Sequence, residues 1–304
     1  MPPYITVVPA STVAGKATVR LLLASSENTL VRGIYRNPAK APSEFTQSPR
    51  FSASKGDVGG DDDLDFTQST AVFYIPLVTY DGRDTSAFAT HAATNVKNAI
   101  ERAGSVKRLV LHSALGAQRD RGIGVLRLNH VSDEMLKAAA PEVVIVRPCN
   151  YFENWTGALR TMRADPPMFK STFSPPDFKI PLVSIKDLAA YCVKALLEQS
   201  HRPTPQYVRV FGPQLRSSHD IKKALEEVTG KEGVLVTIPP ESLAEHFAKE
   251  LPASYVQDFV EFMTAQLPGG VLEEEYECTE DTVRGKVELV DGLRGIAAEL
   301  ASEG

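Results

Sequence analysis

Residues 4–15 of the chain read YITVVPASTVAG, and this stretch decides the fold class. Residues 4–8 are mostly β-branched, which favours a strand. Residues 17–24 place a valine and three leucines so that most of them face one side of a helix. Between the two lies a short turn of small residues. A strand, a tight turn and a helix in this order form the place where a dinucleotide-binding fold holds a pyrophosphate.

The turn at residues 9–15 departs from the usual glycine-rich pattern. Against G-x-x-G-x-x-G, only the third glycine is present, at Gly15, and this glycine serves close packing of the helix on the strand. Pro9 has no N–H to donate, and Thr12 brings a branched side chain to the point where a phosphate would touch the backbone. The hydroxyls of Ser11 and Thr12 are possible replacements for the lost donors. The motif alone leaves open whether the turn binds a dinucleotide.

A basic residue stands where the second strand is expected to end. Arg36 lies about 20 residues after Gly15, and Lys40 follows soon afterwards. An NAD site has an acidic residue at this place for the ribose hydroxyls, whereas an NADP site has a base for the 2′-phosphate. The sequence therefore favours NADP(H), and a solvated basic loop is the alternative.

Strands and helices alternate through the first half of the chain. Apolar runs predict further strands at residues 30–35, 71–75, 108–112 and 143–146, and helical periodicity predicts helices at 86–103 and 129–139. Strands that alternate with helices form βαβ units, and continuous apolar runs are typical of parallel strands buried on both faces. We therefore predict an α/β fold with a Rossmann-type, doubly wound parallel sheet.

After residue 148 the pattern changes. Residues 164–181 contain five prolines, which predicts an irregular loop. Helices are expected at residues 185–197, 217–229, 241–249 and 254–266, and strands at 206–211 and 235–238. Ser217 or Ser218 is the expected N-cap of the helix that stops at Gly230. We predict a dinucleotide-binding-type domain over residues 1–155 and a smaller C-terminal α/β substrate lobe over residues 156–304, with segments that return to the main sheet.

Composition narrows the class of protein. The 304 residues carry 33 Lys and Arg against 38 Asp and Glu, and the net charge of −5 gives no reason to expect binding to nucleic acid or to an anionic membrane. Three widely spaced cysteines fit neither a disulfide framework nor a metal site. The N-terminus has no signal-peptide pattern, and no apolar run is long enough to span a bilayer. We expect a cytoplasmic protein, monomeric or homodimeric, whose partner is a small molecule.

Several segments match one known family in their order and spacing. They are VRGIYRNP at residues 31–38, KGDV at 55–58, AVFYIP at 71–76, residues 95–104, VKRLVLHS at 106–113, residues 130–136, RPCNYFEN at 147–154, IPLVSIKDLA at 180–189 and residues 207–212. The chain thereby resembles the NmrA-like branch of the atypical short-chain dehydrogenases over nearly its whole length. Within that branch it resembles fungal natural-product reductases such as the festuclavine and agroclavine synthases of ergot alkaloid formation. The branch includes redox-sensing regulators, reductases and an occasional cyclase, so the resemblance implies the scaffold and leaves the activity open.

The resemblance implies NADP(H) as cofactor and places its contacts at definite positions. It carries the phosphate turn to Pro9, Ser11, Thr12, Val13, Ala14 and Gly15, the 2′-phosphate site to Arg36 and Lys40, the adenine side to Asp57 and Val58, the loop after the fourth strand to Ile75 and Pro76, and the nicotinamide floor to Ser113 and Pro148. Pro9 and Thr12 depart from the family pattern, which puts the pyrophosphate contacts in doubt.

Acid–base chemistry also departs from the conventional pattern. Conventional short-chain dehydrogenases transfer a proton with a tyrosine and a lysine four residues later, where this sequence has His130 and Glu134. The spacing puts both on one face of a helix, where the carboxylate would orient a catalytic imidazole; a structural pair is the alternative. Ser113 is a third candidate, expected at the carboxyl edge of the sheet, or else a cap. No metal site is predicted, because His91, His201, His219 and His246 have no acidic or cysteine partner at ligand spacing.

Aromatic residues cluster just after the strand expected at 143–146. Such side chains would suit a flat, apolar substrate, for example an aromatic polyketide or an alkaloid, and core packing is the alternative. The predicted substrate contacts are Tyr80, Asn150, Tyr151, Phe152 and Trp155.

Three functions compete. The first is an NADP(H)-dependent reductase of a small, largely apolar metabolite, with a proton from His130 or water; an iminium substrate would need no protein acid. The second is a redox-neutral isomerase, dehydratase or cyclase on a degenerate cofactor site. The third is a non-catalytic dinucleotide-sensing regulator. The turn at residues 9–15, taken together with Arg36, is the feature that bears on all three.

Overall fold

The computed structural model describes residues 2–25, 28–60, 64–198 and 204–302. Its largest element is a parallel sheet of eight strands in the order β13-β10-β6-β5-β4-β1-β2-β3. In that order the strands are Thr282–Arg284, Gln206–Phe211, Glu142–Pro148, Arg108–His112, Ala71–Tyr74, Tyr4–Val8, Leu30–Tyr35 and Phe51–Lys55. β1 pairs in parallel with both β2 and β4, so the strand order reverses at β1, as in doubly wound folds.

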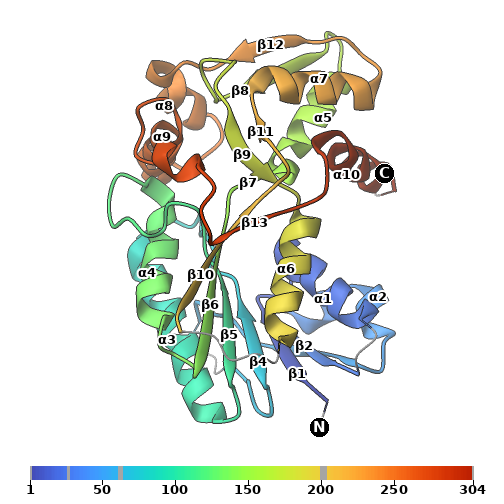
Figure 1. The fold of residues 1–304 in the computed structure, drawn as a ribbon, viewed down its shortest axis with the longest axis vertical. Helices are drawn as coiled ribbons and strands as arrows, with labels where there is room; N and C mark the ends of the chain where they lie inside the picture. Colours follow the sequence, from blue (N-terminus) through green and yellow to red (C-terminus); the bar gives the residue numbers. More distant parts are fainter. Residues whose placement is uncertain (1, 26–27, 61–63, 199–203, 303–304) are drawn as a thin grey trace. The chain divides into compact units, whose positions relative to one another are not determined.

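Helices cover both faces of this sheet (Figure 1). α3 (Thr85–Ala103) and α4 (Arg127–Leu136) lie on one side, and α1 (Val13–Ala24) and α6 (Ile185–Leu197) lie on the other. On the α3 side, Val72, Leu109 and Ile145 belong to one buried apolar cluster that also includes residues of α3. Because both faces are covered, central strands such as β4 and β5 are buried on both sides and read as apolar runs, whereas the edge strands β3 and β13 are partly exposed. The predicted α/β fold with a doubly wound parallel sheet is confirmed.

The chain forms two compact units, and neither is continuous in sequence. The first consists of Met1–Gln118, Leu126–Arg147 and Leu188–Val208, and the second of Arg119–Val125, Pro148–Asp187 and Arg209–Gly304. The predicted boundary at residue 155 stays a prediction.

The second unit contains both strands and helices. A three-stranded sheet joins β11 (Leu215–Arg216), β9 (Ile180–Val183) and β7 (Asn150–Tyr151), and β12 (Val234–Thr237) pairs in parallel with β8 (Met168–Ser171). Its helices are α5 (Thr156–Arg163), α7 (Ser218–Thr229), α8 (Leu243–Phe247), α9 (Ala253–Gln266) and α10 (Leu289–Ser302), with 3-10 turns η3 (Phe152–Trp155) and η5 (Glu273–Tyr276).

The loop predicted over residues 164–181 is wrong in part, because β8 lies within it. Phe169 and Ser171 are buried while Lys170 between them is exposed, and this alternation suits a strand that β12 pairs on one side. Four of the five prolines, at residues 166, 167, 175 and 176, flank β8 and leave its N–H groups intact, and Pro181 lies in β9, which begins at the end of the predicted loop. At α7 the predicted ends are confirmed: Ser217 caps the helix, and Gly230 ends it with a φ of 68°.

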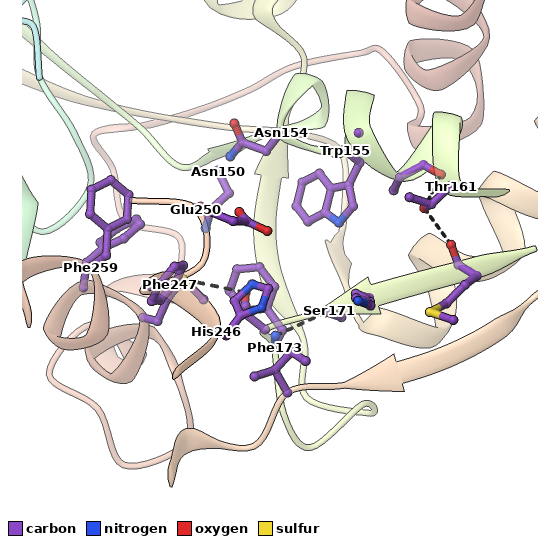
Figure 2. Close-up of a pocket in the computed structure, with 18 residues that line it drawn as sticks. Asn150, Asn154, Trp155, Thr161, Ser171, Phe173, His246, Phe247, Glu250 and Phe259 are labelled. Carbon is purple, nitrogen blue, oxygen red and sulfur yellow. Dashed lines mark hydrogen bonds between the residues drawn. The ribbon is translucent and has the colours of Figure 1, made fainter. Parts of the chain in front are cut away.

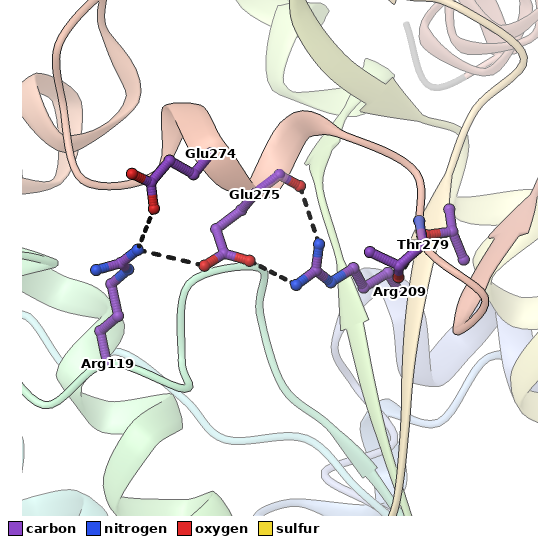
Figure 3. Close-up of polar contacts among 6 residues, drawn as sticks. Arg119, Arg209, Glu274, Glu275 and Thr279 are labelled. Atoms are coloured by element: carbon purple, nitrogen blue, oxygen red, sulfur yellow. Dashed lines mark hydrogen bonds and ion pairs between the residues drawn. The ribbon is translucent and has the colours of Figure 1, made fainter.

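Within the second unit, an ion pair of Arg119 and the close packing of Gly124 on α9 hold the segment Arg119–Val125 in place. The carboxylate of Glu275 accepts a hydrogen bond from Arg119 Nη2 at 3.5 Å and another from Arg209 Nη2 at 2.6 Å (Figure 3). Gly124 lies so near α9 that a Cβ there would be 2.6 Å from Phe262 N and nearer still to Asp258 O. Gly124 also has a φ of +53°, which a side chain disfavours.

Candidate functional site

Six neighbouring strands present the predicted cofactor contacts at one edge of the sheet. The carboxyl ends of parallel strands meet at the same edge, where open α/β sheets bind ligands. In strand order the contacts are Pro148 at the end of β6, Ser113 after β5, Ile75 and Pro76 after β4, residues 9–15 after β1, Arg36 and Lys40 after β2, and Asp57 and Val58 after β3. The fold thus gathers residues that are widely separated in sequence.

The β1–α1 turn is closed by its own side chain. Thr12 caps α1: its Oγ1 accepts a hydrogen bond from Gly15 N at 2.9 Å and donates one to Pro9 O at 3.2 Å. A Cβ on Gly15 would lie 2.7 Å from Pro9 O and 2.8 Å from Thr12 Oγ1. Gly15 is therefore required by the packing of the turn itself. Thr12 accepts the hydrogen bond of the Gly15 N–H group, which a bound phosphate would otherwise accept.

Donors remain at the start of α1. The N–H groups of Val13 and Ala14 have no acceptor within the helix, and no backbone acceptor elsewhere in the described chain binds them. The exposed side chain of Ser11 adds a hydroxyl beside them. Two N–H groups, a hydroxyl and a helix N-terminus fit a phosphate, with fewer donors than a glycine-rich turn supplies.

Two cations stand beside this turn without a protein partner. Arg36 directly follows β2, the neighbour of β1, and Lys40 ends the 3-10 turn η1 (Pro38–Lys40), which Asn37 caps. Both side chains are exposed, and neither forms a hydrogen bond or an ion pair with the residues that the structure describes. The residues present therefore fit NADP(H) best at its 2′-phosphate, because a guanidinium and an ammonium are free to bind there.

The predicted adenine-side contacts are partly committed to the protein. Asp57 Oδ1 accepts a hydrogen bond from Gly59 N at 3.0 Å, which leaves its second oxygen for a ligand. Val58 is buried in the apolar core, and its carbonyl accepts from Asn95 Nδ2 at 3.0 Å. Ile75 is buried as well, and its N–H donates to Val8 O at 2.9 Å. It therefore belongs to the buried layer beneath the candidate cofactor site.

The predicted acid–base pair on α4 is not joined by a hydrogen bond. Glu134 accepts from Lys137 Nζ at 2.6 Å, and His130 Nδ1 lies 2.9 Å from Ala117 O. A carbonyl only accepts, so Nδ1 carries the hydrogen and Nε2 of the neutral ring keeps its lone pair. Lys137 lowers the pKa of the Glu134 carboxyl by a hydrogen bond and by its charge.

Asp133, next to Glu134, is the buried acid of α4, and the sequence analysis missed it. Its Oδ2 accepts from Arg147 Nη2 at 2.9 Å and from Arg147 Nε at 3.3 Å. Burial raises the pKa of Asp133 to about 6, although Arg147 and Ser113 act to lower it. Sequence alone gives no signal for this role, because the charge pattern HVSDE does not tell which acid faces the sheet.

The second unit encloses a cavity of about 720 Å³ (Figure 2). This volume is within the usual range for small-molecule sites. Its lining residues come from η3, α5, β8, α8 and α9 and the segments beside them: Asn150, Asn154, Trp155, Gly157, Ala158, Thr161, Met168, Lys170, Ser171, Thr172, Phe173, Ile238, His246, Phe247, Glu250, Phe259, Phe262 and Met263. The predicted contacts Asn150 and Trp155 are among them.

Aromatic rings dominate two parts of this cavity. Trp155 and Phe173 have ring centroids 6.3 Å apart, and Phe247 and Phe259 have centroids 5.7 Å apart. Figure 2 shows the side chain of Glu250 between Trp155 and Phe247 in this view. The lining residues on α8 and α9 were not predicted from the sequence. The signal available for them was the three-residue spacing of Phe259 and Phe262, which puts both rings on one face of a helix.

The other predicted substrate residues lie elsewhere. Phe152 is buried and packs so closely on Gly292 that a Cβ there would lie 3.1 Å from its ring Cε2. Tyr151 is in β7 and does not line the cavity. Tyr80 belongs to the first unit and is half exposed.

Clusters of metal ligands and membrane-spanning helices are both absent from the part of the chain that the structure describes. No three side chains of the types His, Cys, Asp and Glu are placed together as metal ligands; His201 lies outside the described residues. None of the helices in this part of the chain is both long and apolar enough to cross a membrane.

Comparison with known proteins identifies a family by sequence and a fold by structure. A family model described as NAD(P)H-binding matches residues 10–199. A search of curated protein sequences found no match.

Three solved structures illustrate the similarity of fold. The triphenylmethane reductase of Citrobacter sp. complexed with NADP(H) has 15% identity and a TM-score of 0.76, over 96% of this chain and 99% of that one. The NADPH-dependent quinone oxidoreductase of Escherichia coli complexed with NADPH has 18% identity and a TM-score of 0.69, over 99% of each chain. Nmra, a negative transcriptional regulator, has 13% identity and a TM-score of 0.73, over 100% of this chain and 98% of that one. At these identities the likeness concerns the fold, which enzymes and a regulator share.

Proposed function

The chain belongs to the NAD(P)H-binding family, and from that premise we propose that it is an NADP(H)-dependent reductase of a small, largely apolar metabolite. The observation that carries the proposal is the pair of exposed cations, Arg36 and Lys40, whose side chains have no partner among the described residues and which follow β2, the neighbour of β1. Solvated lysines and arginines are common, but two of them at the end of β2 suit the 2′-phosphate that distinguishes NADP from NAD.

The cavity of the second unit supports the substrate class. Its aromatic walls favour a flat apolar molecule, and the polar groups Asn150, His246 and Glu250 would fix its orientation. Asn150 is itself held, because its Nδ2 donates to Gln266 Oε1 at 2.6 Å. An aromatic or alkaloid-like natural product fits this description, and we propose that the protein acts on it in the cytoplasm as a monomer or homodimer.

Bound NADPH would supply a hydride. His130, with its Nδ1 hydrogen fixed on Ala117 O, offers Nε2 as the atom that carries a proton to and from solvent. Ser113, after β5, would contribute to the floor on which the nicotinamide rests. The N–H groups of Val13 and Ala14 would hold the pyrophosphate, and Arg36 and Lys40 the 2′-phosphate.

The decisive experiment is calorimetric titration of the purified protein with NADPH, NADP⁺ and NADH. We expect Arg36→Ala to weaken NADPH binding about 10- to 100-fold, the loss of a charge-assisted hydrogen bond, and to leave NADH binding unchanged. Arg294→Ala removes the same charge from a surface pair with Glu227 in the second unit and is the matched control. No binding of either dinucleotide at millimolar concentration would refute the proposal.

A second candidate is favoured by the capped turn. Because Thr12 occupies Gly15 N–H, the site is poorer in phosphate donors than a glycine-rich turn, as expected for redox-neutral chemistry or for a dinucleotide-sensing regulator. The distinguishing measurement is NADPH consumption with a panel of quinones and triphenylmethane dyes, the substrates named for two proteins of similar fold. Tight NADPH binding without consumption by any acceptor would favour the second candidate.

A further inference from the structure

Five polar side chains gather on the α4 face of the sheet, at the carboxyl ends of its strands. Tyr74, Ser113 and Arg147 come from the ends of β4, β5 and β6, and Ser132 and Asp133 come from α4. We call these residues the edge cluster. Below them the same face is apolar, with Val72, Leu109 and Ile145 among its core residues. A polar layer that closes an apolar core at the ligand-binding edge is a place where function, rather than packing, explains the residue types.

The carboxylate of Asp133 is used on one side only. Both contacts from Arg147, at 2.9 and 3.3 Å, go to Oδ2, and the Arg147 guanidinium itself lies over the ring of Tyr207 at 4.4 Å. Oδ1 is buried and has no hydrogen-bond partner among the described residues. A structural ion pair would require only Oδ2, so the second oxygen remains available.

The Ser113 hydroxyl acts on the Asp133 carboxyl without a formed hydrogen bond to it. The Ser113 backbone N–H is bonded to Val146 O at 2.7 Å, which holds the residue next to Arg147. Its side chain is buried, and Oγ, like Asp133 Oδ1, has no partner at hydrogen-bond distance within the described chain. The Ser113 hydroxyl nevertheless lies near enough to lower the pKa of the Asp133 carboxyl. A buried hydroxyl without a hydrogen-bond partner is destabilising, so a small rotation that joins these two groups is favourable.

We propose that Asp133 is a positioning residue that sets the direction of the Ser113 hydrogen bond. When Asp133 is ionised, it accepts the hydrogen of Ser113, and the serine presents only lone pairs to a ligand at the edge. When Asp133 is protonated, its O–H donates to Ser113 Oγ, and the serine hydrogen turns to the ligand. The only covalent change is the O–H bond that forms on Asp133 when a hydronium ion of the solvent gives up a proton and becomes water; the Ser113 O–H bond stays intact and only changes its acceptor.

The surroundings of Asp133 place this change in a useful range. Burial raises its pKa to about 6, while the guanidinium of Arg147 on β6 lowers it, as does His130 of α4 whenever its ring is protonated. Tyr207 of β10 presents its ring to Arg147, and Tyr74 of β4 has its own pKa raised by burial, so neither adds a charge. Glu134 and Lys137 on the outer side of α4 neutralise each other.

The inference deepens the proposed function and rests on it for its enzymatic consequence. A serine that donates can bind an oxygen that gains negative charge, so the protonated state suits reduction of a carbonyl or quinone rather than of an iminium. The reductase rate is then highest at acid pH and falls as Asp133 ionises.

The first measurement needs no cofactor. In protein labelled with ¹³C at the aspartate carboxyls, we expect one resonance that titrates near pH 6 and is absent from Asp133→Asn. In Ser113→Ala the same resonance should titrate at higher pH, because a donor to the carboxylate is lost. An Asp133 resonance that titrates in the ordinary range near pH 4, or one that Ser113→Ala leaves unmoved, would overturn the proposal.

The second measurement is the pH profile of NADPH-dependent quinone reduction. We expect kcat of the wild type to fall by up to about tenfold per pH unit above pH 6. In Asp133→Asn the amide nitrogen can donate to Ser113 as protonated Asp133 would, so kcat should be independent of pH. Glu142→Gln is the matched control, since it removes the carboxylate of another largely buried ion pair of β6, with Arg108, at the opposite end of the strand; its profile should follow the wild type.

The two measurements separate the two proposals. If NADPH fails to bind while the Asp133 resonance still responds to Ser113→Ala, the switch stands and the proposed reductase falls. If NADPH is consumed but Asp133→Asn keeps the wild-type pH profile, the reductase stands and the switch falls.

Discussion

Arg209 donates two hydrogen bonds to Glu275: its Nη2 lies 2.6 Å from Glu275 Oε2, and its Nη1 lies 3.4 Å from the Glu275 backbone oxygen (Figure 3). The same carboxylate also faces Arg119, and its side chain is only 11% exposed. One buried carboxylate thus compensates two guanidinium groups.

Glu275→Gln should therefore lower the free energy of unfolding by about 1–3 kcal/mol, because it removes the buried carboxylate that Arg209 contacts and leaves Arg119 with only the exposed Glu274. Chemical denaturation measures this difference. Glu274→Gln is the control: Glu274 contacts Arg119 but is 87% exposed, so its loss should change stability by less than about 0.5 kcal/mol. Equal effects of the two variants would contradict the assignment.

Gly124→Ala should destabilise the protein by about 2 kcal/mol or more. The new methyl group would overlap the backbone of α9 at Asp258 and Phe262, and the residue has a positive φ. Gly269→Ala isolates the second effect, since Gly269 has a φ of +77° but no neighbour within 4 Å; about 1 kcal/mol is expected there. Because Phe262 lines the cavity, Gly124→Ala alone should also reduce the affinity for an aromatic ligand.

Thr12→Gly should tighten NADPH binding by up to about tenfold, because it frees Gly15 N–H for the pyrophosphate. The gain should be accompanied by a loss of a few tenths of a kcal/mol in stability, since glycine is a tolerated N-cap. Calorimetry measures the first effect and thermal unfolding the second. Thr12→Ser keeps the capping hydroxyl and should keep wild-type affinity; a gain with serine would show that the methyl group, not the hydrogen bond, is responsible.

Asp133 should make the protein less stable as pH rises. Burial raises its pKa from 3.8 to about 6, so the folded state binds this proton more tightly than the unfolded chain does. The corresponding stabilisation is complete below about pH 4 and is lost as pH rises through about 6. Between those limits the wild type should lose about 3 kcal/mol relative to Asp133→Asn, measured by urea denaturation at each pH. A constant difference between the two proteins would mean that the pKa is not raised.

The fold could be predicted from sequence because its strands are buried on both faces. The apolar runs at residues 71–75 and 108–112 predicted β4 and β5, and the helical pattern between them predicted α3. β8 was missed, since Met168–Ser171 is short, half polar and surrounded by prolines. Its pairing with β12, more than sixty residues away in sequence, is what makes it a strand.

The candidate site could be predicted from the sequence only for residues that directly follow a strand, because the ends of parallel strands lie at one edge of the sheet. Arg36 could be proposed from the sequence because strand ends and cofactor phosphates have a fixed relation in this fold. Asp133 was missed because its pairing with Arg147 joins α4 to β6, and no local sequence pattern connects the two residues. The cavity partners of Trp155 lie on α8 and α9, about a hundred residues further along the chain, and no local pattern connects them.

The discontinuity of the two units has a consequence for synthesis on the ribosome. A nascent chain that has reached only the end of β6 exposes that strand as the edge of the sheet, because β10 is its neighbour. At that stage Arg108 also lacks the carbonyl of Ala195, and Val143 N–H lacks the hydroxyl of Thr204. The first unit can close only after residue 208 has been made, by which time Pro148–Asp187 of the second unit has already emerged. Translation therefore delivers the two units interleaved, and an unprotected β6 edge during that interval is the point at which a chaperone would be needed.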